Sequence, residues 1–468
     1  MVETMMTQEA VLDLLRKVKD PDLGRDIVSL GFVKDIRTSE GDLFLTIELT
    51  TPACPVKEQI KEEARRALLS LPNIKNVEIE MTSRVRGTQP PEMERLVPQV
   101  KNIIPIASGK GGVGKSTVSA NLVTALAQLG AKVGLVDMDV YGPSIPTLMG
   151  TIGTPTLVDG KVIPVEAHGV KIISMGFFIP KGEALIWRGP MLTKIVDQFL
   201  GDVAWGDLDY LVVDLPPGTG DVQLSLCQSV PLTGAVIVST PQDVALRVAE
   251  RAIVMFEKLY TPILGIIENM SGFVCSHCGH QEEIFGRGGA RRYCFDHDIP
   301  FLGEVPLSTD IRSSSDSGLP IVLADPDSPS SKAFIMVAQN LAAQMSIRAE
   351  ESEKRLEDDG GKYHPEPEEI SQPSKEKIQI LWKDGHESLY SARHLRLNCH
   401  CAGCVDEVSG KRILREESVP EDVYPLSIHP VGRYAYQFLW SDGHSTGIYS
   451  FDHLRKLCQC STCMRERM

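Results

Sequence analysis

The sequence lacks any apolar run long enough to cross a membrane. It also lacks an excess of basic residues: its formal net charge is −14 at pH 7, whereas general nucleic-acid-binding proteins usually carry a basic surface. The first residues, MVETMMTQEAVLD, are acidic and contain neither the apolar core of a signal peptide nor an Arg- and Ser-rich transit segment. These absences lead us to expect a cytoplasmic protein with no nucleic-acid or membrane partner.

Cysteine, by contrast, is abundant and unevenly placed. Most of the eleven cysteines lie in three tight clusters. In a reducing compartment such clusters indicate metal ligands rather than disulfides. The clusters are Cys275/Cys278, Cys399/Cys401/Cys404 and Cys458/Cys460/Cys463. Cys227 lies in an apolar stretch and is interpreted as a buried small hydrophobe.

The 468-residue length predicts several domains, and composition separates them. Helical spacing over 8–19 and 56–70, with strand-like alternation over 43–50, predicts a small α+β domain over 5–85. A Pro-containing linker is expected over 86–99.

The segment 100–345 repeats a short β-branched run followed by a helical pattern. The runs have few polar interruptions, as expected for strands of a buried parallel sheet, so we predict a doubly wound, mainly parallel α/β domain. The predicted strands are NIIPIAS, KVGLVDMD, YLVVDLP, GAVIVST, ILGIIENM and FLGEVPL. Residues 346–375 are charged, acidic and poor in large apolar groups, and we expect a flexible linker there.

The last segment, 376–468, contains an internal repeat: LWKDGHESLYSARHLRLNCHCAGC matches LWSDGHSTGIYSFDHLRKLCQCSTC. Each copy runs from a Trp-x-Asp-Gly-His turn to Leu-Arg and then to Cys-x-Cys-x-x-Cys. Because Asp-Gly between apolar runs is a hairpin signal, we predict a small β-rich, metal-binding domain.

A glycine-rich loop, GKGGVGKST, fits the pattern GxxxxGK[ST] between a predicted strand and a predicted helix. Its backbone N–H groups and the helix N-terminus would receive the phosphates of ATP, Lys115 would pair with their charge, and Ser116 would hold Mg²⁺. The candidate nucleotide-binding residues are Gly109, Lys110, Gly111, Gly112, Val113, Gly114, Lys115, Ser116 and Thr117.

Acidic residues end two of the predicted strands. Asp137 and Asp139 follow one strand and Asp214 follows another. The carboxyl ends of parallel strands line the ligand crevice of such sheets, so we expect all three carboxylates beside the nucleotide.

The loop resembles the deviant P-loop of the MinD/ParA/nitrogenase-reductase-like ATPases. The resemblance implies that Lys110 reaches the nucleotide of a partner subunit across an ATP-bridged homodimer. Spacing alone would also allow a solvated lysine. It further implies that Asp139 orients the attacking water and that Asp214 binds Mg²⁺ through water, with Asp137 also available to the metal. Asn269 matches the position that contacts adenine.

The order of motifs GKGGVGKST, DMDVYGPS, WRGPM, DLPPGTGD, TPQDVAL and ENMSGFVCSHCG resembles the Mrp/ApbC-type P-loop ATPases, which carry iron–sulfur clusters. The resemblance implies that Cys275 and Cys278 meet their counterparts in a second subunit. Together they would hold one [4Fe–4S] cluster, received from cluster donors and passed to apo-proteins. Local spacing alone favours a zinc knuckle within one subunit, completed by His277, His280 or Cys294.

The first segment, with DPDLGRDIVSLGFV and TTPACPV, resembles a small iron–sulfur assembly domain. This implies that Cys54 is a transient cluster ligand or transfer point. A lone cysteine near a helix start could be an activated thiolate or an inert turn cysteine.

The repeat segment resembles the N-terminal domain of γ-butyrobetaine hydroxylase, which implies a Zn²⁺ site at Cys399, Cys401, Cys404 and His444. The repeat itself predicts a second set, Cys458, Cys460 and Cys463 with His386, by pseudo-twofold symmetry. The alternative is an exposed tail motif that relays iron–sulfur or binds nothing. His394, His400 and His453 are interpreted as ordinary surface or helix histidines.

Together these features predict an ATP-hydrolysing iron–sulfur cluster carrier. A ParA/MinD-like positioning ATPase is the first alternative, but it needs a terminal amphipathic helix or a basic patch, and the sequence offers neither. A redox enzyme like nitrogenase reductase would place its cysteines on separate elements. A zinc or nickel metallochaperone would be colourless when loaded.

Overall fold

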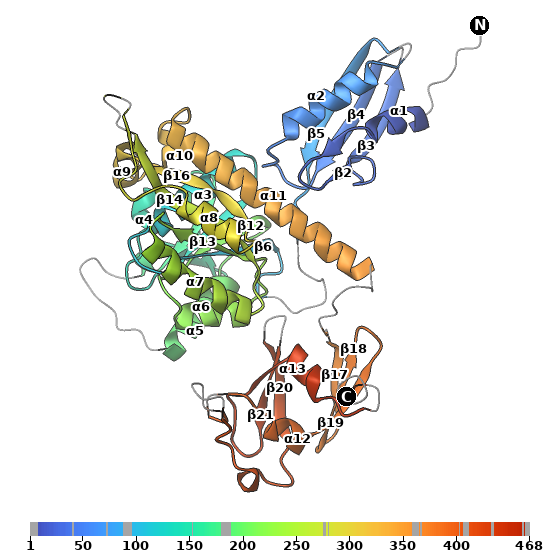
Figure 1. The fold of residues 1–468 in the computed structure, drawn as a ribbon, viewed down its shortest axis with the longest axis vertical. Coiled ribbons are helices and arrows are strands. Elements are labelled where there is room, and N and C mark those ends of the chain that lie inside the picture. The colour runs from blue at the N-terminus through green and yellow to red at the C-terminus, as the bar shows by residue number, and fades with distance from the viewer. Residues whose placement is uncertain are drawn as a thin grey trace. The chain divides into compact units, whose positions relative to one another are not determined.

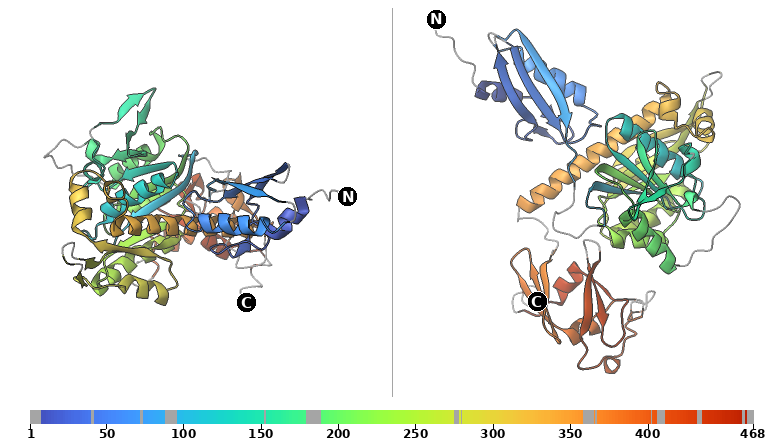
Figure 2. Two further views of the ribbon diagram at one scale, coloured as in Figure 1. Left: turned by 90° about the horizontal axis from the view of Figure 1, so that it is seen from above. Right: turned by 180° about the vertical axis from the view of Figure 1, so that it is seen from behind.

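The computed structural model describes most of the chain, and Figures 1 and 2 show its elements. The described residues are 8–39, 42–71, 74–87, 96–151, 153–178, 189–274, 278, 280–357, 365, 367–401, 403–405, 411–431, 435–460 and 463. The chain divides into two compact units: Met1–Cys227 with Leu232–Arg355, and Gln228–Pro231 with Leu356–Met468.

The N-terminal part of the first unit is an α+β module, as predicted. Its sheet has the order β3-β4-β5, with β3 antiparallel and β5 parallel to β4. Alternate residues of β4 are buried against the apolar stripe of α2, which explains the period of two in one element and the helical period in the other. The elements are α1 (Gln8–Leu15), β1 (Lys19–Asp20), β2 (Arg25–Asp26), β3 (Val33–Ser39), β4 (Asp42–Leu49), α2 (Lys57–Leu68) and β5 (Asn76–Ser83).

The larger part of this unit is built on a nine-stranded sheet of order β10-β11-β7-β12-β6-β13-β14-β15, with β16 also paired to β14. The neighbouring strands along β11-β7-β12-β6-β13-β14 are parallel, and so is the pair β14-β16. Strand β10 pairs antiparallel with β11, and β15 pairs antiparallel with β14. The strands are β6 (Val100–Ala107), β7 (Val133–Asp137), β10 (Val165–Ala167), β11 (Val170–Ser174), β12 (Leu208–Asp214), β13 (Ala235–Ser239), β14 (Ile263–Val274), β15 (Gln281–Glu282) and β16 (Phe301–Leu307).

Both faces of this sheet are buried. Ile104, Ile106 and Val212 share one apolar cluster with α3, α10 and α11, and their neighbours on the other face, such as Ile103 and Val213, are equally inaccessible. Burial on both faces explains the continuous apolar runs. The helices are α3 (Lys115–Gln128), α4 (Ile145–Leu148), α5 (Gly189–Gly201), α6 (Asp221–Ser229), α7 (Asp243–Lys258), α8 (Gly289–Asp296), α9 (Thr309–Asp316), α10 (Ile321–Ala324) and α11 (Pro329–Glu357). Two short strands, β8 (Thr156–Val158) and β9 (Lys161–Ile163), form a separate hairpin, and the 3-10 turn η1 (Met175–Phe177) follows β11.

The segment predicted as a linker over 346–375 contains regular structure on both sides of residues 358–364, which lie outside the described part. Helix α11 continues to Glu357, and strand β17 occupies Pro367–Ser374. The Glu-, Lys- and Arg-rich sequence consists of good helix formers, and Ala349 is still buried, at 5% exposure. The acidic composition of this stretch was therefore not sufficient to predict a flexible chain, since helix α11 continues through it to Glu357. Of the other predicted linker, 86–99, residues 88–95 lie outside the described part.

The second unit consists of two similar halves, as the repeat predicts. Each half is a three-stranded antiparallel sheet followed by a short helix, and the halves share one core that contains Trp382 and Trp440. The elements are β17, β18 (Lys377–Trp382), β19 (Glu387–Ser391), α12 (Ala392–Leu397), η2 (Glu416–Ser418), β20 (Pro425–Val431), β21 (Ala435–Trp440), β22 (Ile448–Ser450) and α13 (Phe451–Leu457).

Candidate functional site

The glycine-rich loop joins the end of β6 to the start of α3 and is anchored to β14. Gly112 and Gly114 both have φ of +79°, a conformation that side chains with a Cβ rarely adopt. A Cβ on Gly114 would lie 2.3 Å from the amide nitrogen of Asn269. That amide donates a 2.8 Å hydrogen bond to the carbonyl of Val113. In this arrangement Asn269 holds the loop, and its expected contact with adenine stays a prediction.

The start of the same loop lies against helix α7. A Cβ on Gly109 would lie 2.4 Å from the carbonyl carbon of Val248, which is backbone and cannot rotate away. For Gly111 the nearest atom to a Cβ would be 3.9 Å away, on Pro217. Packing therefore requires a glycine at position 109 and does not require one at position 111.

Asp214, at the end of β12, binds the two polar side chains that open α3. The Lys115 ammonium lies 2.7 Å from Asp214 Oδ2, and Ser116 donates to the same oxygen at 2.6 Å. Ser119 donates to Oδ1 at 2.6 Å. The ion pair is buried, with side-chain exposures of 6% for Lys115 and 0% for Asp214. Lys115 and Ser116, the groups expected to receive phosphate and Mg²⁺, thus share one carboxylate oxygen.

Asp137 is the register partner of Asp214 on the neighbouring strand β7. It accepts hydrogen bonds from the Ser174 hydroxyl at 2.8 Å and from the backbone N–H of Ile145 at 3.2 Å. Burial, followed by the nearby charge of Asp214, raises the pKa of Asp137 to about 7. The carboxylates of Asp137 and Asp214 lie on neighbouring strands, and Asp214 is paired with Lys115. Such a pair of carboxylates can bind a divalent cation at this edge of the sheet.

Asp139 and Lys110 lie at the accessible side of this site. The Asp139 carboxylate accepts from the backbone N–H groups of Tyr141 and Gly142, both at 3.2 Å, in the turn that follows β7. Lys110 is half-buried, and no ion pair of its ammonium is found within the described part of the chain. The roles expected of both residues need water or a second subunit, and they remain predictions.

The CxxC pair follows directly after β14. Cys275 lies outside the described residues, as does His277. Cys278 is exposed. Cys294 is buried in α8, where its thiol contacts the carbonyl of Pro300 at 3.7 Å. Among the described residues, Cys278, His280 and Cys294 do not gather into a ligand set, which gives the zinc knuckle no support from this part of the chain.

Cys54 precedes α2 in a loop whose neighbour Ala53 belongs to the core of the nucleotide-binding part. In the same loop, the Thr51 hydroxyl lies 3.1 Å from the hydroxyl of Tyr210. Burial raises the pKa of Cys54 to about 11, and a hydrogen bond from Val56 offsets only part of that effect. This raised pKa favours the protonated thiol at neutral pH, and a role of Cys54 as a transient cluster ligand or transfer point stays a prediction.

The C-terminal unit gathers both predicted Cys/His sets. In each set all four ligand atoms lie within 4.8 Å of one another. His444 Nε2 lies 3.3, 3.5 and 3.8 Å from the sulfurs of Cys399, Cys401 and Cys404. Burial and the charge of Arg396 lower the pKa of His444, which favours the neutral imidazole that a metal ion binds.

The comparisons decide the family. The model of the NUBPL iron-transfer P-loop NTPase matches residues 99–342, just over half of the chain. The chain belongs to this family of iron–sulfur cluster carriers. The iron–sulfur cluster assembly protein model matches residues 8–81, and the γ-butyrobetaine hydroxylase-like N-terminal model matches residues 369–455. All three resemblances predicted from the motifs are confirmed, as is the fold class of a mainly parallel P-loop NTPase sheet with two small flanking domains.

Relatives of this carrier family extend over most of the chain. The iron–sulfur cluster carrier protein of Deinococcus radiodurans is 50% identical over 342 residues, covering 73% of this chain and 96% of its own. The chloroplastic Fe–S cluster assembly factor HCF101 of Oryza sativa is 38% identical over 458 residues, covering 96% of this chain and 82% of its own. A solved nucleotide-binding protein from Archaeoglobus fulgidus, in complex with ADP, is 43% identical with a TM-score of 0.43, and the match covers 48% of this chain and 89% of that one.

The carrier's described helices include none that is both long and apolar enough to span a bilayer.

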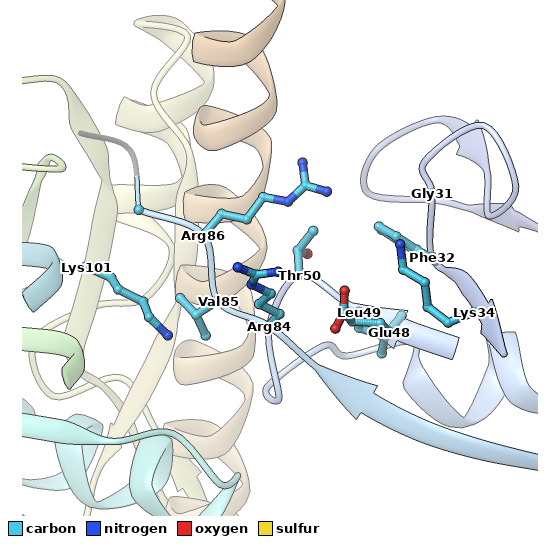
Figure 3. Close-up of a pocket in the computed structure, with 11 residues that line it drawn as sticks. Gly31, Phe32, Lys34, Glu48, Leu49, Thr50, Arg84, Val85, Arg86 and Lys101 are labelled. Atoms are coloured by element: carbon cyan, nitrogen blue, oxygen red, sulfur yellow. The ribbon is translucent and has the colours of Figure 1, made fainter. Parts of the chain in front are cut away.

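A pocket of about 510 Å³ opens beside the segment that follows β5 (Figure 3). Its lining includes Lys34, Glu48, Arg84, Arg86 and Lys101. None of the predicted site residues is among its described lining, so this pocket is separate from the nucleotide loop.

Sequence reasoning missed two residues of the nucleotide site. Ser119 was readable as a polar residue one helical turn after Lys115, which places it on the same face of α3. Ser174 ends β11, a five-residue strand that was not predicted, and so its contact with Asp137 carried no local signal.

Proposed function

We propose that this carrier binds one [4Fe–4S] cluster between two copies of the chain and passes it to apo-proteins, with ATP binding and hydrolysis controlling the exchange. One observation supports the coupling most directly: strand β14 connects the two sites. Asn269, within β14, bonds to the nucleotide loop, and the CxxC motif starts one residue after Val274, where the strand ends.

The nucleotide site supports a change of partners on ATP binding. Lys115 and Ser116 would leave Asp214 for the phosphates and for Mg²⁺, and the freed carboxylate would join Asp137 near the metal. Mg²⁺ would neutralise charge on the transferred phosphoryl group. Asp139 would orient the attacking water, and Lys110 would reach the nucleotide of the partner subunit. Because α3 and β14 both contact the loop, this exchange would alter the strand that leads to Cys278.

The ligand count supports a shared cluster. A [4Fe–4S] cluster takes four thiolates, whereas the motif offers Cys275 and Cys278 in each chain. Two chains supply the set, and an exposed Cys278 suits a ligand that must meet its counterpart and later release the cluster. Cluster donors and apo-proteins would be the partners, in the cytoplasm. Cys54, protonated and half-buried, would serve at most as a transient transfer point.

The C-terminal set fits a structural ion. Tetrahedral Zn²⁺, with bonds of about 2.3 Å to sulfur and about 2.0 Å to nitrogen, places these ligand atoms about 3.6 Å apart. The distances from His444 to its three cysteines, 3.3 to 3.8 Å, agree with that value. We therefore assign Cys399, Cys401, Cys404 and His444 to Zn²⁺.

The test is anaerobic reconstitution with iron and sulfide, followed by visible absorption and EPR. Wild type should acquire one cluster per two chains, and Cys278→Ala should lose at least nine-tenths of it. Cys294→Ala is the matched control, because a zinc knuckle would use that thiol and a shared cluster would not. Equal cluster binding by wild type and Cys278→Ala would refute the proposal. Colourless protein that binds only zinc or nickel would favour the metallochaperone instead.

A further inference from the structure

The two halves of the C-terminal unit exchange equivalent contacts. Tyr390 donates a 2.8 Å hydrogen bond to the carbonyl of Leu454, and Tyr449, its repeat counterpart, donates a 2.9 Å bond to Leu395. Each bond crosses from the last strand of one half to the helix of the other. The pairing is therefore reciprocal, as a pseudo-twofold axis between the halves requires.

Two arginine–aspartate ion pairs also cross between the halves in a reciprocal way. Arg455 lies 2.7 Å from Asp384, and Arg396 lies 2.8 Å from Asp442. In each pair the aspartate belongs to the Asp-Gly-His turn of one half and the arginine to the helix of the other. Both turns are thereby held against the opposite helix, and each turn ends in a histidine two residues after its aspartate.

This exchange brings His386, from the first half, to the cysteines that follow the second helix. His386 Nε2 lies 3.3 Å from Cys458 Sγ, 3.7 Å from Cys460 Sγ and 3.6 Å from Cys463 Sγ. The four ligand atoms lie within 4.8 Å of one another. Cys458 and Cys463 are buried, at 0% and 6% exposure, so this is a packed cluster and not an exposed tail motif.

We propose that His386, Cys458, Cys460 and Cys463 bind a second single metal ion, Zn²⁺, in addition to the ion at the His444 set. The distances match the separation of about 3.6 Å expected between sulfur and nitrogen ligands of tetrahedral zinc. A cubane cluster would hold its thiolates farther apart, because each thiolate binds a different iron. Three thiolates and one imidazole are also the donors that zinc prefers. The site is independent of the carrier function proposed above.

Each ion would join the two halves, because each set takes its histidine from one half and its cysteines from the other. Binding free energy at such sites adds to folding free energy. The two sites are not identical in their surroundings. Gly447 is an extra residue in the second repeat, and a Cβ there would lie 2.9 Å from Cys399 Sγ. Gly447→Ala therefore offers a way to disturb the first site and spare the second.

The direct test is zinc content of the full-length chain by elemental mass spectrometry, in a Cys278→Ser background that removes zinc binding at the CxxC motif. The parent should hold two zinc ions per chain, and His386→Ala should hold one. His444→Ala should also hold one, and the double variant none. His429→Ala, an exposed histidine outside both sets, should keep two. A parent with one ion, or His386→Ala with two, would overturn the proposal.

A second variant separates ligand loss from misfolding. His386→Cys keeps four donors at the site, so it should still bind two Co²⁺ ions per chain. The absorption of one of the two ions should shift towards that of a four-thiolate site, while the Gly447→Ala variant should perturb only the other ion. An unchanged cobalt spectrum in His386→Cys would show that His386 is not a ligand.

Discussion

Replacing Asp214 by asparagine tests the buried network at the nucleotide site. Asparagine keeps the size of the side chain but removes the charge that faces Lys115, which is 6% exposed. Breaking a buried ion pair by removing one partner costs about 3–5 kcal/mol. Loss of Asp214 also relieves the repulsion that helps raise the pKa of Asp137. This relief offsets part of the loss, so we expect the low end, about 3 kcal/mol.

Hydrogen exchange followed by mass spectrometry can read this effect in the nucleotide-free full chain, because peptides from α3 and β12 report separately from the C-terminal unit. A loss of about 3 kcal/mol corresponds to roughly 100-fold faster exchange in those peptides. Lys101→Ala is the matched control: it breaks an ion pair of equal length, 2.7 Å, whose lysine is 40% exposed. Such surface pairs contribute at most about 1 kcal/mol, or roughly fivefold in exchange. Equal effects of the two substitutions would refute the argument from burial.

Three further outcomes follow from the packing. Gly109→Ala should loosen the contact between the loop and α7 by about 1–3 kcal/mol, seen as faster exchange in α7, whereas Gly111→Ala should leave it unchanged. The pKa of Cys54 is about 11, against an ordinary 9.0, so its alkylation at pH 8 should be roughly 100-fold slower than that of a free cysteine peptide. The alkylation rate should keep rising up to about pH 11. A rate that levels off below pH 9 would contradict the burial argument. A zinc chelator should accelerate exchange in α12 and α13 and leave β6 and β12 unaffected; equal acceleration everywhere would show that the metal does not act locally.

Much of the nucleotide site was predictable because its signals are local. The glycine loop and the opening of α3 are contiguous in sequence. The pairing of Asp137 with Asp214 follows once both end parallel strands. Ser119 could have been found from its helical spacing to Lys115, whereas the contact of Asp137 with Ser174 was not predictable, because it depends on β11 lying beside β7 in the sheet, which no single segment encodes.

Other features needed tertiary packing. Helix α11 extends into a stretch whose composition suggested a flexible linker, because residues such as Ala349 find a buried environment. The raised pKa of Cys54 was not predictable, because it depends on the packing of its loop against the nucleotide-binding part. The family resemblance implied the set with His444, and the symmetry of the repeat then predicted the second set with His386. The structure places His386 and His444 beside the cysteines of the opposite copy.

The central claim is that two chains share one cluster through their CxxC motifs, and native mass spectrometry of the reconstituted protein tests it most directly. Wild type mixed with a mass-tagged Cys278→Ala chain should carry a [4Fe–4S] cluster only in dimers of two wild-type chains, with one cluster in each such dimer. A monomer that retains a complete cluster, or a dimer of two Cys278→Ala chains that carries one, would contradict the account.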